Sequence, residues 1–246
     1  MERSGIGHRV EVKHCVPESL AERALSWARV IAPDPIAESQ QLTSIYFDSP
    51  DRTFYRWQRE KRPVRFKLRL RRYGAGGNPI YAEVKHRIGG VGSKSRVAVP
   101  AALVPLLLEP DRAIANIDRG PLGLEEFWGC CRAYAASPSM LVSYHRQALR
   151  DRSGISELSI TVDRKIVYQV AGRDPLAPEG AAWRLLDLPG EVSSNVRPSA
   201  RELSAAIVEV KYSGRLPVWT VRLLDALDGY RTSFSKYEAA VRQDLR

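Results

Sequence analysis

Apolar and polar residues alternate along several short stretches of this 246-residue sequence. In a β-strand, residues i and i+2 point to the same face, so alternation predicts strands with one apolar and one polar face. Residues 64–73 form the longest clear example. Alternation or richness in β-branched and aromatic residues predicts further strands at residues 9–16, 42–48, 80–86, 93–99, 140–150, 156–170 and 207–212, with a shorter one within 183–188.

Helices are predicted at both ends and in the middle of the chain. Apolar residues three and four positions apart indicate helices over residues 17–31, 217–227 and 235–245. Residues 100–135 are expected to be mostly helical, with breaks at prolines. Residues 171–200 are rich in proline and glycine and are expected to form a long loop or lid. The pattern predicts one α+β domain over residues 1–246, built on an antiparallel sheet.

The predicted strand at residues 64–73 has an unusual polar face. Its apolar face carries Val64, Phe66, Leu68 and Leu70, whereas its polar face carries Arg65, Lys67, Arg69 and Arg71. Four like charges in a row repel one another, so an anion is expected opposite them. The strand that ends at Val99 adds Lys94 and Arg96, again two positions apart.

Three other strands share a Glu-x-Lys motif that places both charges on one face. The motif occurs as Glu11 and Lys13, as Glu83 and Lys85, and as Glu209 and Lys211. A single strand of this kind usually turns its charged face to water. Five strands with the same pattern favour another arrangement, in which a β-barrel has a lumen lined by Lys and Arg and is covered outside by helices.

The chemistry of such a lumen suits phosphates. Arginine offers a planar fork that matches phosphate oxygens, and lysine offers a point charge. The interspersed carboxylates are candidate ligands for Mg²⁺ or Mn²⁺, which bridge phosphate oxygens. The net charge of +10 agrees with an anionic ligand. Nucleic acid fits less well, because acidic residues in its binding face would repel it.

The order of these motifs resembles a known family. RVEVKH, RFKLRLRRYG, YAEVKH, KSR, SYHRQAL, ITVDRKI, IVEVKY and SFSKYEAA follow one another as in the VTC-type polyphosphate polymerase domain, one of the triphosphate tunnel metalloenzymes. The resemblance covers residues 8–242. It implies a closed antiparallel eight-stranded tunnel with helices packed outside. It also implies transfer of the γ-phosphoryl group of ATP to inorganic polyphosphate, with pyrophosphate and triphosphate as related ligands.

The resemblance also implies roles for individual residues. Positive charge that neutralises the reacting phosphates would come from Lys13, Arg69, Arg71, Lys85, Arg146 and Lys236. Further phosphate contacts are expected from Arg65, Lys67, Lys94, Arg96, Lys211 and Arg164. The metal, Mn²⁺ or Mg²⁺, would be held by Glu209, with Glu11 or Glu83 as further ligands. Asp163 is either a second metal ligand or a residue with a structural role.

One position departs from the family pattern and leaves alternatives open. Ser159 stands where an arginine is usual, and Arg164 or Arg152 would have to replace that charge. The alternatives are a triphosphate or nucleotide hydrolase and a non-catalytic polyphosphate-binding module. No apolar stretch approaches the ~20 residues of a membrane helix, and residues 1–13 lack the apolar core of a signal peptide. A cytoplasmic protein is expected, and any membrane association would require a membrane-protein partner.

Overall fold

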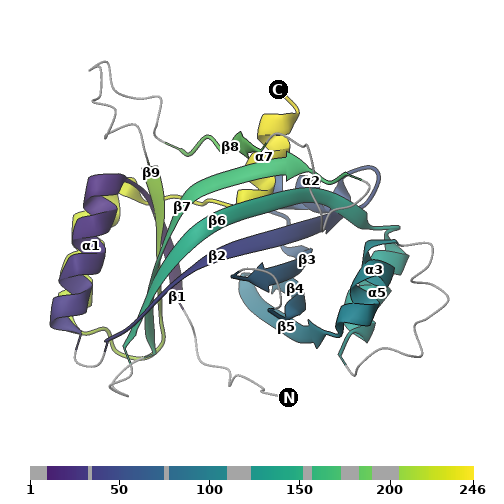
Figure 1. Cartoon of the computed structure of the whole chain (residues 1–246). Coiled ribbons are helices and arrows are strands. Elements are labelled where there is room, and N and C mark those ends of the chain that lie inside the picture. The colour runs from purple at the N-terminus through teal and green to yellow at the C-terminus, as the bar shows by residue number, and fades with distance from the viewer. Residues whose placement is uncertain are drawn as a thin grey trace. The chain divides into compact units, whose positions relative to one another are not determined.

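The architecture is an antiparallel β-sheet with helices, seen in a computed structural model that describes residues 10–32, 35–74, 78–109, 123–151, 157–172, 183–189 and 205–246 (Figure 1). The strands are β1 (Val10–Pro17), β2 (Pro35–Asp48), β3 (Val64–Tyr73), β4 (Ile80–Ile88), β5 (Val91–Val99), β6 (Ser137–Asp151), β7 (Leu158–Val170), β8 (Arg184–Leu185) and β9 (Ala205–Tyr212). The helices are α1 (Glu18–Ile31), α2 (Thr53–Arg59), α3 (Val104–Leu108), α5 (Glu125–Ala133), α6 (Val218–Leu227) and α7 (Lys236–Asp244), with 3₁₀ turns η1 (Ala101–Leu103) and η3 (Asp228–Tyr230).

The sheet is open, so the prediction of a closed eight-stranded barrel is wrong. Hydrogen-bonded neighbours follow the order β1-β9-β7-β6-β2-β3-β4-β5, and the short β8 pairs with β7. Within the described ranges, the two outer strands β1 and β5 are not paired with each other. Alternation assigns side chains to the two faces of a strand, but it carries no information on whether the edges of a sheet meet.

The chain divides into two compact units. The first comprises residues 1–40, 145–165 and 187–234, and the second comprises residues 41–144, 166–186 and 235–246. The long strands β2, β6 and β7 contribute residues to both units. Most of the predicted loop at residues 171–200 lies outside the described residues, as does Arg152. None of the described helices is long and apolar enough to span a membrane.

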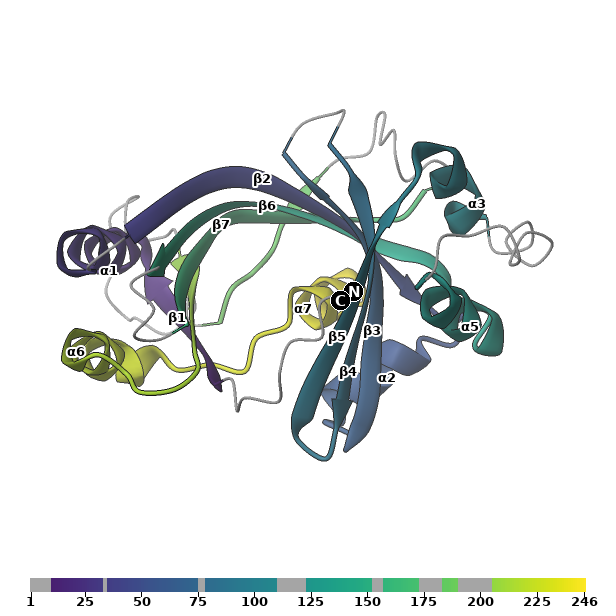
Figure 2. The ribbon, with the colours of Figure 1, turned by 90° about the horizontal axis from the view of Figure 1, so that it is seen from below.

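In the first unit, helices cover the apolar face of the strands. Figure 2 shows α1 and α6 side by side, and the edge of the Trp27 ring meets Trp219 with centroids 6.3 Å apart. Their buried side chains pack on the apolar positions of β7 and β9, including Ile160 and Val208. Because side chains alternate along a strand, those of Ser159 and of the charged residues of β9 point to the opposite face, together with their neighbours in register.

In the second unit, the apolar face of β3 and β4 lies under α2, α3 and α5. Phe66 and Leu68 of β3 belong to one buried cluster with Phe54 of α2 and Phe127 of α5. The rings of Phe54 and Phe66 lie 4.5 Å apart. Burial of this face leaves the arginines and lysines of β3–β5, except Arg72, on the other one, which agrees with the predicted separation of charge.

Candidate functional site

The polar face of β3, β4 and β5 in the second unit is strongly basic. It carries eight basic side chains, four from β3 and two each from β4 and β5, and one acidic side chain, Glu83. The antiparallel register places Lys67, Lys85 and Lys94 in one row across the three strands. Lys67 Nζ donates to Ser235 Oγ at 2.9 Å, whereas Lys85 is exposed.

Glu83 is the buried centre of this face, with only 1% of its side chain exposed. Its carboxylate lies 2.5 Å from the Arg69 guanidinium and 2.6 Å from Lys94 Nζ. Burial alone would raise the pKa of Glu83, but the charges of Arg69, Arg71 and Lys94 lower it to about 2. One carboxylate therefore stays ionised among several cations, and the face keeps a positive excess.

Arg71 is buried and is held by neutral hydroxyl groups. Its Nε donates to Ser44 Oγ at 3.0 Å, and its Nη2 donates to Tyr144 Oη at 3.0 Å. Lys236 lies at the same tyrosine, with Nζ 4.5 Å from the Tyr144 ring centroid. The hydroxyl groups orient the guanidinium but do not cancel its charge, which leaves Arg71 suited to a phosphate oxygen.

Tyr46 of β2 is a site residue that the sequence analysis missed. It lies opposite Arg69 in the register of β2 and β3, and its hydroxyl accepts a 3.2 Å hydrogen bond from Arg69 Nη1. Burial alone would raise the pKa of Tyr46, but the nearby charges of Arg69 and Arg71 lower it to about 7, with contributions from two lysines. Its hydroxyl therefore titrates near neutral pH, within the basic face.

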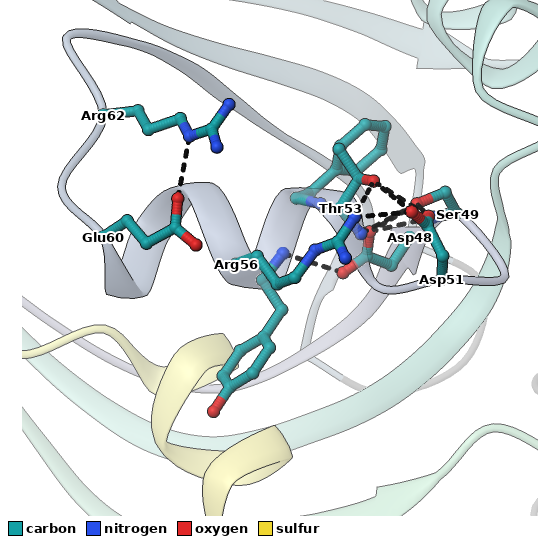
Figure 3. A network of polar contacts seen from close by, with 9 residues as sticks. Asp48, Ser49, Asp51, Thr53, Arg56, Glu60 and Arg62 are labelled. Carbon is teal, nitrogen blue, oxygen red and sulfur yellow. Dashed lines mark hydrogen bonds and ion pairs between the residues drawn. The ribbon is translucent and has the colours of Figure 1, made fainter.

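A hydrogen-bond network at the start of α2 holds α7, which carries Lys236. Figure 3 shows Asp48, Ser49, Asp51 and Thr53 gathered there. The Asp48 carboxylate is buried and accepts hydrogen bonds from the backbone N–H groups of Phe54 at 2.8 Å and Tyr55 at 2.9 Å. It also accepts one from the hydroxyl of Tyr237, next to Lys236. Burial and Asp48 raise the pKa of Tyr237, so this phenol stays a donor.

Replacing Asp48 with alanine should destabilise the protein by about 3 kcal/mol, because a helix cap is lost and the Tyr237 hydroxyl loses its buried acceptor. The measurement is the free energy of unfolding in urea. Asp51→Ala is the control, since this carboxylate is 60% exposed and its partners Ser49, Thr53 and Arg56 can turn to water instead, so its loss should cost clearly less. Equal losses in both variants would contradict the structural role of Asp48.

The first unit has its own charged cluster, where two Glu-x-Lys motifs meet. Glu11 lies opposite Lys211, and Lys13 lies opposite Glu209, across β1 and β9. Lys13 Nζ is 2.8 Å from Glu11 Oε1 and 3.4 Å from Glu209 Oε2, and Lys211 also pairs with Glu209. Burial alone would raise the pKa of Glu209, but Lys211 and Lys13 hold it well below its usual value. Glu209 is thus anionic, and the two carboxyl groups share the same lysines.

Thr161 of β7 lies against this cluster. It pairs with Glu209 in the register of β7 and β9, and its Oγ1 is buried without a hydrogen-bond partner. Carboxylate and hydroxyl oxygens are the hard ligands that Mg²⁺ or Mn²⁺ prefers. No three His, Cys, Asp or Glu side chains of the described residues gather as a complete metal site. The donor set therefore fits a divalent ion whose remaining ligands come from water or phosphate.

Two further predicted residues in the first unit are held by carboxylates. Arg146 makes a bidentate pair with buried Asp163, at 2.6 and 2.7 Å. Arg164 pairs with Glu18 and Glu22 of α1 and with Gln147. Asp163 therefore orients Arg146. Arg164, by contrast, lies on the α1 side of β7 and does not belong to the charged cluster of Glu11, Lys13, Glu209 and Lys211. Ser159 is paired in register with Lys211, which brings a lysine to the strand position beside it.

Arg65, another residue predicted to contact phosphate, lies near the edge of the basic face. It is opposite Arg87 in register, and its guanidinium donates to the backbone carbonyl of Arg62. Burial and the charge of Arg87 lower its pKa. The second unit thus brings together most of the predicted phosphate residues, whereas Lys13, Arg146, Lys211, Glu11 and Glu209 belong to the first unit.

The fold is an open antiparallel sheet with a dense basic face on β3–β5. A family model described as the VTC domain matches residues 8–243, so this chain belongs to the VTC-domain family. This confirms the resemblance found in the motifs. None of the curated proteins matches the sequence significantly.

Solved structures share the fold at low sequence identity. A proposed adenylyl cyclase from Hippeastrum, described as having a dominant triphosphatase activity, is 12% identical with a TM-score of 0.51, and 96% of each chain is covered. A proposed adenylate cyclase from Vibrio parahaemolyticus is 13% identical with a TM-score of 0.47, covering 96% of this chain and 98% of that one. At these identities the similarity concerns the fold alone.

Proposed function

We propose that this protein is a polyphosphate polymerase that transfers the γ-phosphoryl group of ATP to the end of an inorganic polyphosphate chain. The observation that carries the proposal is the basic face of β3–β5, where eight cations surround one buried carboxylate. A linear chain of phosphates offers repeated negative charge that matches rows of cations about 7 Å apart along a strand. Membership of the VTC-domain family supports this substrate class.

Phosphoryl transfer requires positioning and neutralisation of charge more than covalent chemistry by the protein. The planar guanidinium groups of Arg69 and Arg71 would orient phosphate oxygens, because their own directions are already fixed. Glu83 and Tyr46 hold Arg69. The hydroxyl groups of Ser44 and Tyr144 hold Arg71. Positive charge to stabilise the negative charge on the transferred phosphoryl group would come from Lys67, Lys85, Lys94 and Lys236.

In the first unit, Glu11 and Glu209 would hold Mn²⁺ or Mg²⁺ through their carboxylates, with Thr161 Oγ1 as a further oxygen. When bound, the metal would neutralise charge on phosphate oxygens. Lys211 and Lys13 keep Glu209 ionised, and Arg146, oriented by Asp163, would contribute a further cation.

Product analysis after incubation with ATP and Mn²⁺ tests the proposal. The polymerase should release ADP and build a polymer whose internal phosphates are resolved by ³¹P NMR. Orthophosphate released without chain growth would identify a hydrolase on the same scaffold. Folded protein that binds tripolyphosphate but leaves ATP intact with any divalent ion would identify a binding module. Either result would overturn the polymerase.

Affinity for tripolyphosphate should fall as the pH rises from 6 to 9. Above a pKa of about 7 Tyr46 gains a negative charge. Desolvation, with help from nearby arginines, lowers the pKa of Lys94 to about 8, above which Lys94 loses its positive charge. Both changes weaken the attraction for an anion, by roughly tenfold in the dissociation constant for each group. Calorimetric titration measures this, and Tyr46→Phe should remove the step near neutral pH while retaining the later one.

A further inference from the structure

Beyond its edge row of Arg65 and Arg87, the polar face of β3–β5 changes from lysine to arginine and then to tyrosine along its length. Its successive rows in register are Lys67, Lys85 and Lys94, then Arg69, Glu83 and Arg96, then Arg71, Tyr81 and Ala98, with Tyr73 beyond them on β3. Cations that suit phosphate thus give way to aromatic rings at one end. A ligand that lies along these strands would meet two different chemistries.

Arg96 is stacked on the two tyrosines at this end. Its guanidinium carbon lies 3.7 Å from the centroid of Tyr81 and 4.9 Å from that of Tyr73. The two rings meet edge to face, with centroids 5.9 Å apart and planes at 84°. Arg96 Nε also lies 3.7 Å from the Glu83 carboxylate. The guanidinium of Arg96 on β5 is therefore held in place by groups on the two strands β3 and β4.

The Arg96 side chain remains partly accessible. It is 40% exposed although its guanidinium carbon lies over the Tyr81 ring and near that of Tyr73. A guanidinium held against aromatic rings and still partly exposed can serve as a stacking surface for a planar aromatic ligand. It also places positive charge against the π system of that ligand. This geometry differs from the fork-on-phosphate role that the sequence suggested for Arg96.

We propose that the partly exposed guanidinium of Arg96, supported by Tyr73 and Tyr81, is the stacking site for the base of the nucleoside triphosphate. The inference rests on the proposed function and specifies how its nucleotide is oriented. Arg96 lies two residues along β5 from Lys94, but its guanidinium reaches the ring of Tyr81, whose row is four residues, or roughly 13 Å, from the row of Lys67, Lys85 and Lys94. This span matches an extended nucleoside triphosphate, so the base lies at the tyrosine end and the terminal phosphate at the lysine row.

The stacking site distinguishes ATP from a phosphate chain without a base. Stacking uses the π face that every base has, so purine nucleotides should bind best because of ring size, with little selection between adenine and guanine. Inorganic tripolyphosphate has no base and gains nothing from the site. The comparison of these two ligands therefore isolates stacking from phosphate binding.

Calorimetric dissociation constants for ATP and tripolyphosphate test the site. Tyr81→Leu should weaken ATP binding about tenfold, near the lower end of what base stacking contributes, and leave tripolyphosphate within about twofold. Arg96→Lys keeps the charge but removes the plane, so it should show the same selective loss and serves if Tyr81→Leu misfolds. Tyr230→Leu, at an exposed tyrosine of the other unit, is the control and should change neither constant.

The outcomes separate this inference from the proposed function. If the wild type binds both ligands and both variants weaken them equally, or leave ATP binding unchanged, stacking on Arg96 is wrong while phosphate binding stands. If the wild type binds neither ligand, the proposed function fails and the stacking site fails with it. Selective loss for ATP in either folded variant supports the site.

Discussion

Glu209→Gln is expected to abolish metal-dependent turnover of ATP while the protein stays folded. Glutamine removes the negative charge that makes Glu209 a ligand for a divalent ion, yet it preserves the side-chain shape in a nearly buried position. Lys13 and Lys211 keep a partner in Glu11, at 2.8 and 3.9 Å. Turnover should fall at least about 100-fold, because even groups that only orient a metal ligand contribute 10–100-fold.

Steady-state release of ADP at several Mn²⁺ concentrations checks this expectation, with the melting temperature as the test of folding. Glu60→Gln is the matched control, because it makes the same chemical change in an exposed pair with Arg62 and should leave turnover unaltered. Wild-type kinetics in folded Glu209→Gln protein would remove Glu209 from the proposed metal site.

Arg69→Ala should weaken the binding of tripolyphosphate by roughly 1.5–3 kcal/mol, the contribution of a hydrogen bond to a charged group. This corresponds to a dissociation constant roughly 10–150 times larger. Arg69 is only 20% exposed, and its guanidinium is fixed by Glu83 and Tyr46. Such preorganisation is why its loss should matter more than the loss of a mobile surface charge.

Calorimetric titration with tripolyphosphate gives the comparison, and Arg62→Ala provides the control. Arg62 is an exposed arginine that precedes the same strand and pairs with Glu60 at 2.8 Å, so its removal should change binding little. Arg69→Lys should recover part of the affinity, because it restores the charge but not the fork. Equal affinities in Arg69→Ala and the wild type would show that phosphate binds elsewhere.

The elements with strong periodicity could be predicted from the sequence. Alternation predicted residues 64–73 as a strand, and β3 has those bounds. The short helix α2 was missed because seven residues have too few turns to show a period, and its start depends on the buried carboxylate of Asp48. The closed barrel was wrong because closure depends on pairing between the first and last strands, which side-chain patterns do not encode.

The site was predictable where it depends on one strand at a time. The basic face of β3 and the Glu-x-Lys motifs follow from period-two spacing alone. Tyr46 could not be found in this way, because only the register of β2 against β3 reveals that it lies opposite Arg69. The interaction of Arg164 with Glu18 and Glu22 likewise requires the packing of α1 on the strands. Partners across strands and helices are therefore the part that local patterns miss.

A crystal structure with a non-hydrolysable ATP analogue and Mn²⁺ tests the central claim most directly. The account predicts phosphate oxygens within hydrogen-bond distance of Arg69 and Arg71, on the polar face of β3. Phosphates bound elsewhere, with this basic face in contact only with solvent, would contradict it.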